Sequence, residues 1–387
     1  MRVALSVGER SGDELAADVA AALLRRRPDA ELIGVTGPRM RAAGVATLAD
    51  VDELGVMGLF EVVRHLPRLA ALRRRLRRDV LAAGVDAFVG VDAPDFHLGL
   101  ARSLRRAGLP TAQVVAPSVW AWRRYRIAKI ARSVDRLLTL FPFEPALFRT
   151  TGLDARFIGH PLADALPLVP DRQAARAALD LGPARPVVAL LPGSRGGEIA
   201  RHAHLLHELA GRLADERGAR TLLLLADPAD AGRFERAAGA DPASLGMQVV
   251  VGRTRLGLTA ADAAVAASGT VTLEALLCRV PTVVFYRLPA ATYRFARALR
   301  LVRSRYVSLP NVLAGEALVP ERIQHAATPE RLLADLCGWL DDPVRVRAFS
   351  KRAAAIHCEL AAGAAAAAAD RIIELAGGRA GADWRLQ

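Results

Sequence analysis

Two aspartates follow a strongly apolar run in FVGVDAPDFHLGLARSL, residues 88–104. Such a run is typical of a buried strand, and the carboxyl end of a parallel strand is where ligands bind. Asp95 follows Pro94 and is explained as a helix cap. Asp92 precedes the turn and is the candidate general base that removes a proton from a hydroxyl group. The structural alternative for Asp92 is an Asx-turn at the strand end.

A glycine-containing turn in ALLPGSRGGEIARH, residues 189–202, predicts phosphate binding. The turn separates a strand pattern from a helix pattern, and backbone N–H groups at the amino end of a helix bind phosphate. Gly193 and Ser194 form the turn, and Arg195 is placed to add a charge-assisted hydrogen bond. The loop is not a Walker loop, because the Gly-Lys-Ser/Thr sequence of that motif is missing.

The same pattern recurs in AAVAASGTVTLEALLC, residues 263–278. Ser268, Gly269 and Thr270 stand at the start of an expected helix, where a diphosphate would be favoured. Glu274 lies about one turn inside, where a carboxylate could accept a hydrogen bond from a ribose hydroxyl. Ordinary capping explains Ser268 or Thr270 alone, but two such turns in one half of the chain favour a nucleotide.

The segment GERSGDELAADVAAALLRR, residues 8–26, leads from the first expected strand into a helix. Ser11 can cap this helix, and Asp13 and Glu14 suit its first turn. Glu9 stands at the tip of the strand, where it either faces solvent or lines a cleft. The loop does not match GxGxxG, so it gives weak support for a dinucleotide site.

Residues 55–83, GVMGLFEVVRHLPRLAALRRRLRRDVLAA, combine apolar side chains with dense arginine. This composition suits an interfacial membrane segment, because anionic headgroups attract arginine while apolar groups enter the lipid boundary. It equally suits a packed helix with a solvated charged face, and residues 292–309 have the same character. The candidate membrane- or acyl-facing residues are Val56, Met57, Leu59, Phe60, Val63, Leu66, Arg73 and Arg74.

The chain has 387 residues, 52% hydrophobic and 24% charged, which predicts two folded domains and excludes bulk disorder. Its formal net charge is +13, carried almost entirely by arginine, since the only lysines are Lys129 and Lys351. Nucleic acid, an anionic membrane surface and phosphorylated small molecules could each meet this excess. A coding bias towards arginine would explain it without any function.

Cysteine usage and hydropathy indicate the compartment. Cys278, Cys337 and Cys358 are widely spaced and form no CxxC pattern, so neither a disulfide framework nor a zinc site is expected. The amino terminus lacks a signal-peptide pattern, and no apolar run approaches the roughly 20 residues of a membrane span. We therefore expect a cytoplasmic protein that can touch a membrane from that side.

Short apolar runs alternate with longer helical patterns, which predicts an α/β fold with two doubly wound parallel sheets. Two such halves facing each other across a cleft would place the active site in that cleft. The domain boundary is expected between residues 164 and 186, where the chain is rich in Pro, Ala and charge. The expected strands are 2–8, 30–37, 86–93, 111–116, 135–141, 155–159, 186–195, 221–226, 247–252, 262–268 and 281–287.

Ten motifs along the chain resemble those of lipid-A-disaccharide synthases, in the same order. They are GERSGD (8–13), GPRM (37–40), GVMGLFEV (55–62), VDAPDF (91–96), APSVWAWR (116–123), LFPFE (140–144), FIGHPLAD (157–164), LLPGSRGGEI (190–199), ASGTVTLE (267–274) and SLPNVLAG (308–315). The resemblance covers nearly the whole chain, and the PSVWAWR and SLPNVLAG motifs are highly specific.

The resemblance implies a GT-B glycosyltransferase with two Rossmann-like domains. The implied reaction transfers a sugar from UDP-2,3-diacylglucosamine to the 6-hydroxyl of 2,3-diacylglucosamine 1-phosphate, giving a β-1′,6-linked disaccharide 1-phosphate and UDP. The donor is α-linked and the product β-linked, so one inverting displacement suffices and no metal or other cofactor is expected. The implied location is cytoplasmic, with peripheral association to an anionic inner membrane; homo-oligomer formation is left open.

The resemblance also assigns domains and residues. Residues 1–165 would face the acceptor and the membrane, 186–345 would bind the UDP-sugar, and 346–387 form helices that could pack back on the first domain. Asp92 matches the family's proposed base, and the residues of the two phosphate turns match its UDP side. Glu9, Ser11 and Asn311 match polar positions of its active site. The 55–83 segment matches its membrane-facing surface.

Three residues depart from the family's usual sequence. Gln113 and Val114 stand where many relatives carry His-Tyr, and His97 replaces a frequent Asn. These departures concern fine substrate contacts. One alternative is another GT-B protein acting on UDP-N-acetylglucosamine, a transferase or 2-epimerase; a more remote one is a nucleic-acid-binding protein, which would leave the PSVWAWR and SGT motifs unexplained.

Overall fold

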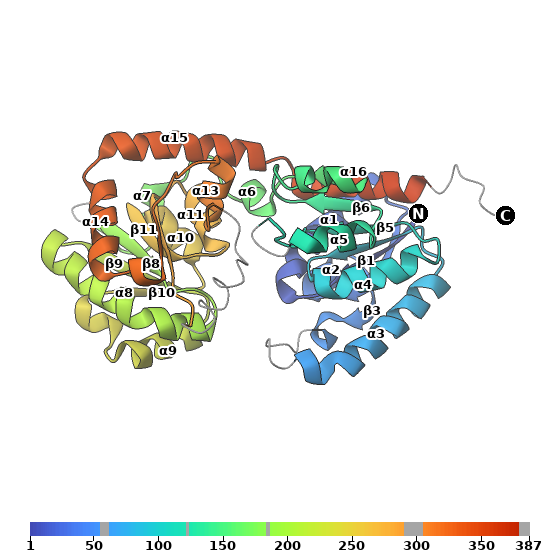
Figure 1. Cartoon of the computed structure of the whole chain (residues 1–387), viewed down its shortest axis with the longest axis horizontal. Helices are drawn as coiled ribbons and strands as arrows, with labels where there is room; N and C mark the ends of the chain where they lie inside the picture. Colours follow the sequence, from blue (N-terminus) through green and yellow to red (C-terminus); the bar gives the residue numbers. More distant parts are fainter. Residues whose placement is uncertain (55–61, 121–123, 183–185, 290–304, 379–387) are drawn as a thin grey trace. The chain divides into compact units, whose positions relative to one another are not determined.

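Buried parallel strands alternate with helices along the chain (Figure 1). The computed structural model describes residues 1–54, 62–120, 124–182, 186–289 and 305–378. The chain divides into two units, one made of Met1–Asp164 with Leu360–Gln387 and one made of Ala165–Glu359. Each unit holds one sheet, so the doubly wound α/β class is confirmed.

The sheet of the first unit has the strand order β3-β2-β1-β4-β5-β6-β7, with every described pairing parallel. Its strands are β1 (Arg2–Val7), β2 (Glu31–Thr36), β3 (Ala46–Asp50), β4 (Ala87–Val91), β5 (Thr111–Val114), β6 (Arg136–Thr139) and β7 (Asp154–Phe157). The central strand β4 is buried at all of its positions, as expected for a parallel sheet covered on both faces.

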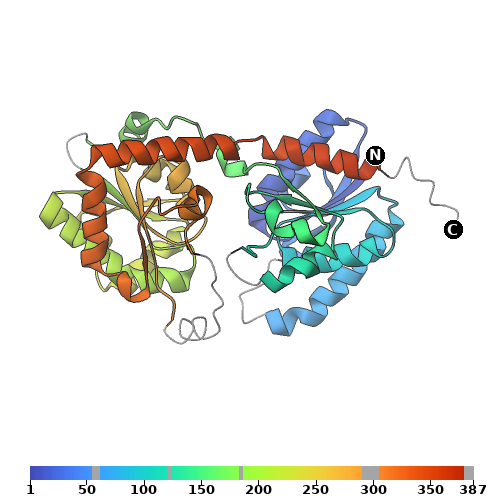
Figure 2. The same ribbon diagram turned by 45° about the horizontal axis from the view of Figure 1, so that its top comes forward.

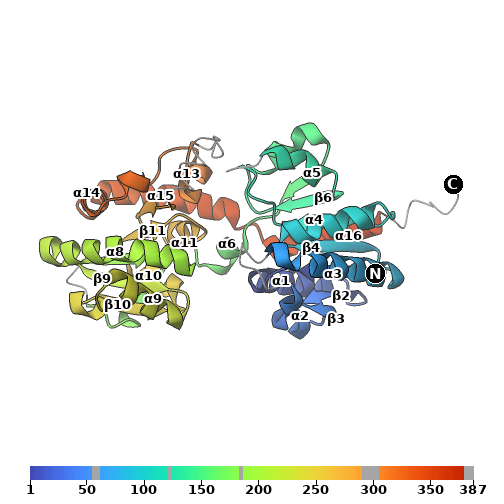
Figure 3. The same ribbon diagram turned by 60° about the horizontal axis from the view of Figure 1, so that its bottom comes forward.

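Alternating side chains of this sheet supply two separate cores. Val3, Leu5 and Val7 of β1 pack with α1 (Arg10–Arg26) and α16 (Ala364–Gly377) on one face. Ala4 of β1 and Phe88 of β4 point to the other face, which α3 (Val62–Ala82) and α4 (Pro94–Arg105) cover. Helices α3 and α4 lie side by side there (Figure 3). The remaining helices of this unit are α2 (Pro38–Ala42), α5 (Ile127–Ala131) and α6 (Pro161–Ala165), the last ending at the boundary.

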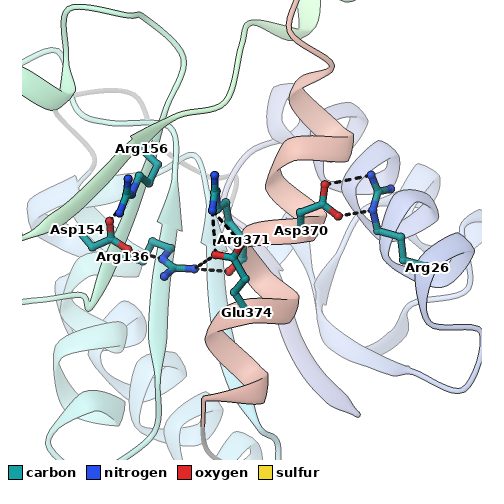
Figure 4. Close-up of polar contacts among 7 residues, drawn as sticks. All are labelled: Arg26, Arg136, Asp154, Arg156, Asp370, Arg371 and Glu374. Atoms are coloured by element: carbon teal, nitrogen blue, oxygen red, sulfur yellow. Dashed lines mark hydrogen bonds and ion pairs between the residues drawn. The ribbon is translucent and has the colours of Figure 1, made fainter.

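The alanine-rich helix α16 returns to the first unit and packs beside α1 (Figure 2). Ala364, Ala368 and Ala369 are fully buried, because their short side chains allow close contact between the elements. Ion pairs flank this contact (Figure 4): Arg26 pairs with Asp370, and Arg136 Nη1 lies 3.2 Å from the carboxylate of Glu374. The run of six alanines at 364–369 is thus part of a packed helix, in line with the high helix propensity of alanine.

Two more contacts fix the start and middle of α16. The carboxylate of Asp164 accepts hydrogen bonds from the backbone N–H groups of Gly363 and Ala364, at 2.9 and 2.6 Å. Arg136 also donates to the carbonyl oxygen of Arg371 at 2.7 Å, and its Nε lies 2.7 Å from Asp154 (Figure 4). One guanidinium group therefore ties two strands of the sheet to the helix.

The second unit repeats the winding with the strand order β10-β9-β8-β11-β12-β13. Its strands are β8 (Val187–Leu191), β9 (Arg220–Leu225), β10 (Gln248–Val251), β11 (Ala263–Ala267), β12 (Thr282–Tyr286) and β13 (Glu321–Ile323). Its helices are α7 (Arg172–Ala177), α8 (Gly196–Arg217), α9 (Pro228–Ala238), α10 (Thr254–Ala260), α11 (Val271–Leu277), α13 (Leu309–Ala314), α14 (Pro329–Leu340) and α15 (Pro343–Leu360). Strands β8 and β11 are buried throughout, and both lead into the candidate phosphate turns.

Candidate active site

Asp92 lies at the point where the winding of the first sheet reverses. Strand β1 has β2 on one side and β4 on the other, and the helices after β1 and β4 cover opposite faces of the sheet. Val7 pairs with Val91, so the loops that follow β1 and β4 are neighbours. Ligands of open α/β sheets bind in the crevice at such a reversal.

The backbone at this point is left-handed at two successive residues. Asp92 has φ 56° and Ala93 has φ 39°, a region that non-glycine residues rarely occupy. The Asp92 N–H donates to the carbonyl oxygen of Val114 at 3.0 Å, which joins the turn to β5. Helix α4 begins at Pro94 with Ala93 as its N-cap residue. Asp95 lies in the first turn of this helix and forms an ion pair with Arg126, so the prediction that Asp95 caps the helix is wrong.

Two glycines of the GERSGD segment make room for this turn. A methyl group on Gly8 would come within 2.0 Å of Ala93 Cβ, and one on Gly12 would lie 3.2 Å from Asp92 Cβ. The loop after β1 therefore approaches the Asp92–Ala93 turn as closely as backbone atoms allow. The sequence signals the glycines, but their contact across strands appears only in the fold.

A pocket of about 290 Å³ opens at the turn. Asp92 and Arg126 are its charged lining residues, and Pro94 with residues 115–119 supplies the rest. Val115 has φ 72°, an outlier for a β-branched side chain, so the wall of the pocket is itself strained backbone. Arg126 belongs to none of the motifs in the sequence, but it lies three residues after PSVWAWR, and this position is the sequence signal that points to it.

The start of α1 differs from the sequence prediction. The helix begins at Arg10 with the exposed Glu9 as its N-cap residue, so Ser11 lies inside the first turn and the expected cap at Ser11 is wrong. The side chain of Ser11 is outside the described structure. Asp13 is buried and accepts hydrogen bonds from the N–H groups of Arg39 and Met40, at 2.8 and 3.1 Å. Asp13 therefore holds the GPRM turn in place.

The second sheet has its own winding reversal, between β8 and β11. After β8, Gly193 takes φ 113°, and Arg195 is the N-cap residue of the long helix α8. The guanidinium of Arg195 is 82% exposed and donates to Glu198 at 3.0 Å. Tyr286 also donates to Glu198, at 2.8 Å. Burial alone would raise the pKa of Glu198, but the hydrogen bonds from Tyr286 and Arg195 lower it below its ordinary value.

Ser268, Gly269 and Thr270 follow β11 directly, and Thr270 is the N-cap residue of α11. Gly269 and Thr270 are exposed, while the Ser268 hydroxyl donates to the carbonyl oxygen of Val307 at 3.3 Å. Glu274 lies one turn into the helix with its side chain 19% exposed, and burial raises its pKa. Because β8 and β11 are neighbouring parallel strands, this second turn lies at the same end of the strands as the Gly193 turn.

Asn311 is buried, and its amide is used within the protein. Its Nδ2 donates to the carbonyl oxygen of Val319 and to Glu321, both at 2.9 Å. Its Oδ1 accepts from the Val319 N–H at 2.8 Å. Glu321 also accepts from the Ser308 hydroxyl at 2.7 Å, so this network fixes the turn that starts α13.

The basic segment is described only in part. Val56, Met57, Leu59 and Phe60 lie outside the described residues, as do the side chains of Val63 and Leu66. Arg73 packs against α4 with its guanidinium 5.2 Å from the centre of the Phe96 ring, and burial lowers its pKa. Arg74 is exposed, as are Arg68, Arg77 and Arg78. No helix in the described parts of the chain is long and apolar enough to cross a membrane.

Comparison with known proteins gives one consistent family. A family model described as lipid-A-disaccharide synthetase matches residues 3–365. The lipid-A-disaccharide synthase of Azotobacter vinelandii is 48% identical over 97% of this chain and 98% of its own length. That of Chromohalobacter salexigens is 46% identical over 97% of both chains. Among solved structures, a UGT transferase of Siraitia grosvenorii in complex with UDP aligns with a TM-score of 0.63 at 13% identity, covering 97% of this chain and 100% of that one. The structural likeness shows the GT-B fold.

Proposed function

Because this chain belongs to the lipid-A-disaccharide synthase family, we propose that Asp92 is the general base of the family's reaction. The enzyme joins UDP-2,3-diacylglucosamine to 2,3-diacylglucosamine 1-phosphate, and releases the disaccharide 1-phosphate and UDP. The observation that carries the proposal is the place of Asp92, a carboxylate lining a pocket at the winding reversal of the first sheet. Relatives at 46 and 48% identity over 97% of the chain do not favour another UDP-sugar enzyme.

The chemistry at Asp92 is a single displacement with inversion. The 6-hydroxyl of the acceptor attacks the anomeric carbon of the donor, the bond from that carbon to the UDP oxygen breaks, and UDP leaves with the bonding electrons. The proton of the hydroxyl passes to the Asp92 carboxylate as the new bond forms. No covalent intermediate with the protein is needed.

The donor side is assigned to the second unit. The backbone N–H groups of Gly193 and Ser194 at the start of α8 suit a phosphate, and the exposed Arg195 can add a charge-assisted hydrogen bond. Glu198 holds Arg195 from one side, so the guanidinium is already oriented before a ligand arrives. Stabilising the charge that develops on departing UDP is then its catalytic contribution.

The second turn completes the donor site. Ser268, Gly269 and Thr270 would contact the diphosphate, and Glu274 would accept a hydrogen bond from a ribose hydroxyl. The partial burial of Glu274 supports this role, because a shielded carboxylate forms a stronger hydrogen bond with a neutral donor.

The acceptor side is assigned to the first unit. Glu9 lies two residues after the end of β1, beside the Asp92 turn, where its carboxylate could bind an acceptor hydroxyl or amide, and Ser11 lies two residues further along. Asn311, in the second unit, has its amide fully engaged with Val319 and Glu321. We therefore assign Asn311 to shaping the loop of the SLPNVLAG motif.

The membrane contact is assigned to residues 55–83, the segment that contains α3. The exposed arginines Arg68, Arg74, Arg77 and Arg78 suit the anionic surface of the inner membrane, since a basic residue near such a surface contributes about 1 kcal/mol. Vesicles containing anionic lipid should retain the protein at low salt, and charge reversal at Arg74 and Arg77 should release it. Charge reversal at Arg217, which pairs with Asp341 in the second unit, is the control. Equal retention of both variants would contradict this assignment.

An assay of the purified protein with both lipid substrates tests the function. Mass spectrometry should detect the disaccharide 1-phosphate and UDP, and Asp92→Ala should abolish both. Asp95→Asn is the matched control, because it changes a carboxylate of the same motif and keeps an oxygen to accept from Arg126. Absence of product with the wild-type protein would refute the assignment, and full turnover by Asp92→Ala would refute the base.

A further inference from the structure

Two buried side chains donate hydrogen bonds to one oxygen, the main-chain carbonyl of Asp92. His97 Nδ1 lies 2.8 Å from it, and Gln113 Nε2 lies 3.0 Å from it. His97 comes from α4 and Gln113 from β5, and neither side chain has any exposed surface. Residues with no exposed surface cannot touch the substrate, so any part they have in the reaction is indirect.

The surroundings fix the orientation of both donors. Gln113 Nε2 also faces the carbonyl oxygen of Val114 at 2.9 Å, so the amide must turn its N–H groups to this side. A carbonyl oxygen only accepts, so His97 Nδ1 must carry the proton of the ring. His97 Nε2 then accepts from the Ser6 hydroxyl, 3.1 Å away on β1. Burial lowers the pKa of His97 to about 4, which keeps the ring neutral at physiological pH.

The sheet leaves room for these side chains at one glycine. A methyl group on Gly90 would lie 2.7 Å from His97 Cβ and 2.8 Å from Gln113 Oε1. Gly90 lies on β4, two residues before Asp92, which follows the end of the strand. The hydrogen bonds therefore lie directly behind the turn that carries the carboxylate.

The turn needs such support because its backbone is strained. A left-handed conformation is unfavourable for a non-glycine residue, and Asp92 and Ala93 adopt it in succession. Strained conformations persist only where the surrounding structure holds them. Rotation of the Asp92 backbone would move its carbonyl and its carboxylate together, because both belong to the same residue.

We propose that His97 and Gln113 are positioning residues, which hold the carbonyl of Asp92 and thereby aim its carboxylate into the pocket. This inference rests on the proposed role of Asp92 as the base. Displacement of a catalytic group by about 1 Å lowers a rate by roughly 100-fold. Loss of either donor is therefore expected to reduce kcat by about 10- to 100-fold and to leave the affinity for UDP unchanged.

The test compares kcat, substrate KM and UDP binding across four variants. His97→Leu and Gln113→Met remove the donors and keep most of the side-chain volume. His97→Asn keeps an N–H donor close to the position of Nδ1. Phe148→Leu is the control for a smaller core, because Phe148 is fully buried in the first unit on the α3 and α4 face. Amide hydrogen exchange in β4 and β5 measures the folded fraction of the first unit, so that kcat is expressed per competent molecule, and UDP titration checks the donor site of the second unit.

The proposal predicts that His97→Leu and Gln113→Met lose kcat, while His97→Asn and Phe148→Leu stay within about threefold of the wild type. Equal kcat in His97→Leu and Phe148→Leu would overturn it, as would a His97→Asn variant as slow as His97→Leu. If His97→Leu does not fold, Gln113→Met decides by the same criterion. Full turnover by Asp92→Asn would refute the role of Asp92 as the base. If Asp92→Asn is inactive while His97→Leu and Gln113→Met are fully active, only the positioning role is overturned.

Discussion

Replacing Gly8 by alanine should both slow the reaction and destabilise the protein. The new methyl carbon would lie 2.0 Å from Ala93 Cβ, whereas ordinary contact begins at 3.4 Å, so the two carbons must separate by 1.4 Å. Neither backbone can move easily, because Gly8 follows β1 and Ala93 comes soon after β4, and these two strands are hydrogen-bonded to each other. The displacement therefore reaches the turn that carries Asp92.

The size of each effect follows from this geometry. Overpacking of this kind costs about 1–3 kcal/mol of the free energy of unfolding. A shift of about 1 Å in a catalytic group costs roughly 100-fold in rate. We therefore expect Gly8→Ala to lose about 100-fold in kcat at a temperature where it remains folded, with UDP affinity unchanged.

A second substitution provides the rescue. Ala93→Gly removes the methyl group that Gly8→Ala would strike, and glycine tolerates the left-handed backbone at this position. The double variant should recover most of the lost rate, giving a large coupling energy in a double-mutant cycle. Gly182→Ala is the control, since no atom of the described residues, apart from its chain neighbours, lies within 4 Å of the added methyl group. Full activity of Gly8→Ala, or no rescue by Ala93→Gly, would refute the reasoning.

Three further predictions follow from charged side chains. Burial raises the pKa of Glu144 from 4.5 to about 7, so the free energy of unfolding should fall by roughly 3 kcal/mol as pH rises through that interval. In denaturant titrations at pH 5 and pH 8, Glu144→Gln should remove this fall. An unchanged pH dependence in the variant would contradict the prediction. Arg136→Met removes the contacts to Asp154 and Glu374, so amide hydrogen exchange should accelerate in α16 and stay constant in α8; uniform exchange across both helices would contradict this. Arg195→Ala should raise the KM for the UDP-sugar about tenfold with little change in the KM for the acceptor, and the reverse pattern would remove Arg195 from the donor site.

The sequence predicts the central strands because burial on both faces leaves a continuous apolar run. Strands β4, β8 and β11 are such runs, and each is found close to its expected range. Strands β3 and β13 were not expected, because they lie at the sheet edges and carry polar, partly exposed residues such as Asp50 and Glu321. Their position depends on pairing with a neighbouring strand, which no local pattern records.

The candidate site likewise contains residues that local sequence patterns predict and residues that they do not predict. Asp92 could be found from its position after a buried strand, since strand ends are local features. The helix caps expected at Ser11 and Asp95 are wrong, because each helix begins before these residues, next to Glu9 and Ala93. Capping preferences rank residue types, but they do not determine at which residue the strand ends and the helix begins.

Other parts of the site arise only from tertiary contacts. The ion pair of Arg126 with Asp95 and the hydrogen bond from Gln113 to the Asp92 carbonyl join residues that are far apart in the chain. The left-handed backbone of Asp92 and the hydrogen bond from nearby His97 depend on how the chain turns after β4. His97 and Gln113 stand out in the sequence as departures from the family resemblance. The structure shows that both contact the same oxygen atom, which the sequence alone does not reveal.

The rate of disaccharide formation by Asp92→Asn tests the central claim most directly. Asparagine keeps the size of the side chain and its hydrogen-bonding oxygen but cannot take the proton of the acceptor hydroxyl. With both lipid substrates saturating and UDP binding intact, we expect a rate roughly 100-fold or more below that of the wild type, in line with the usual contribution of a general base. An Asp92→Asn enzyme that forms the disaccharide at the wild-type rate would contradict it.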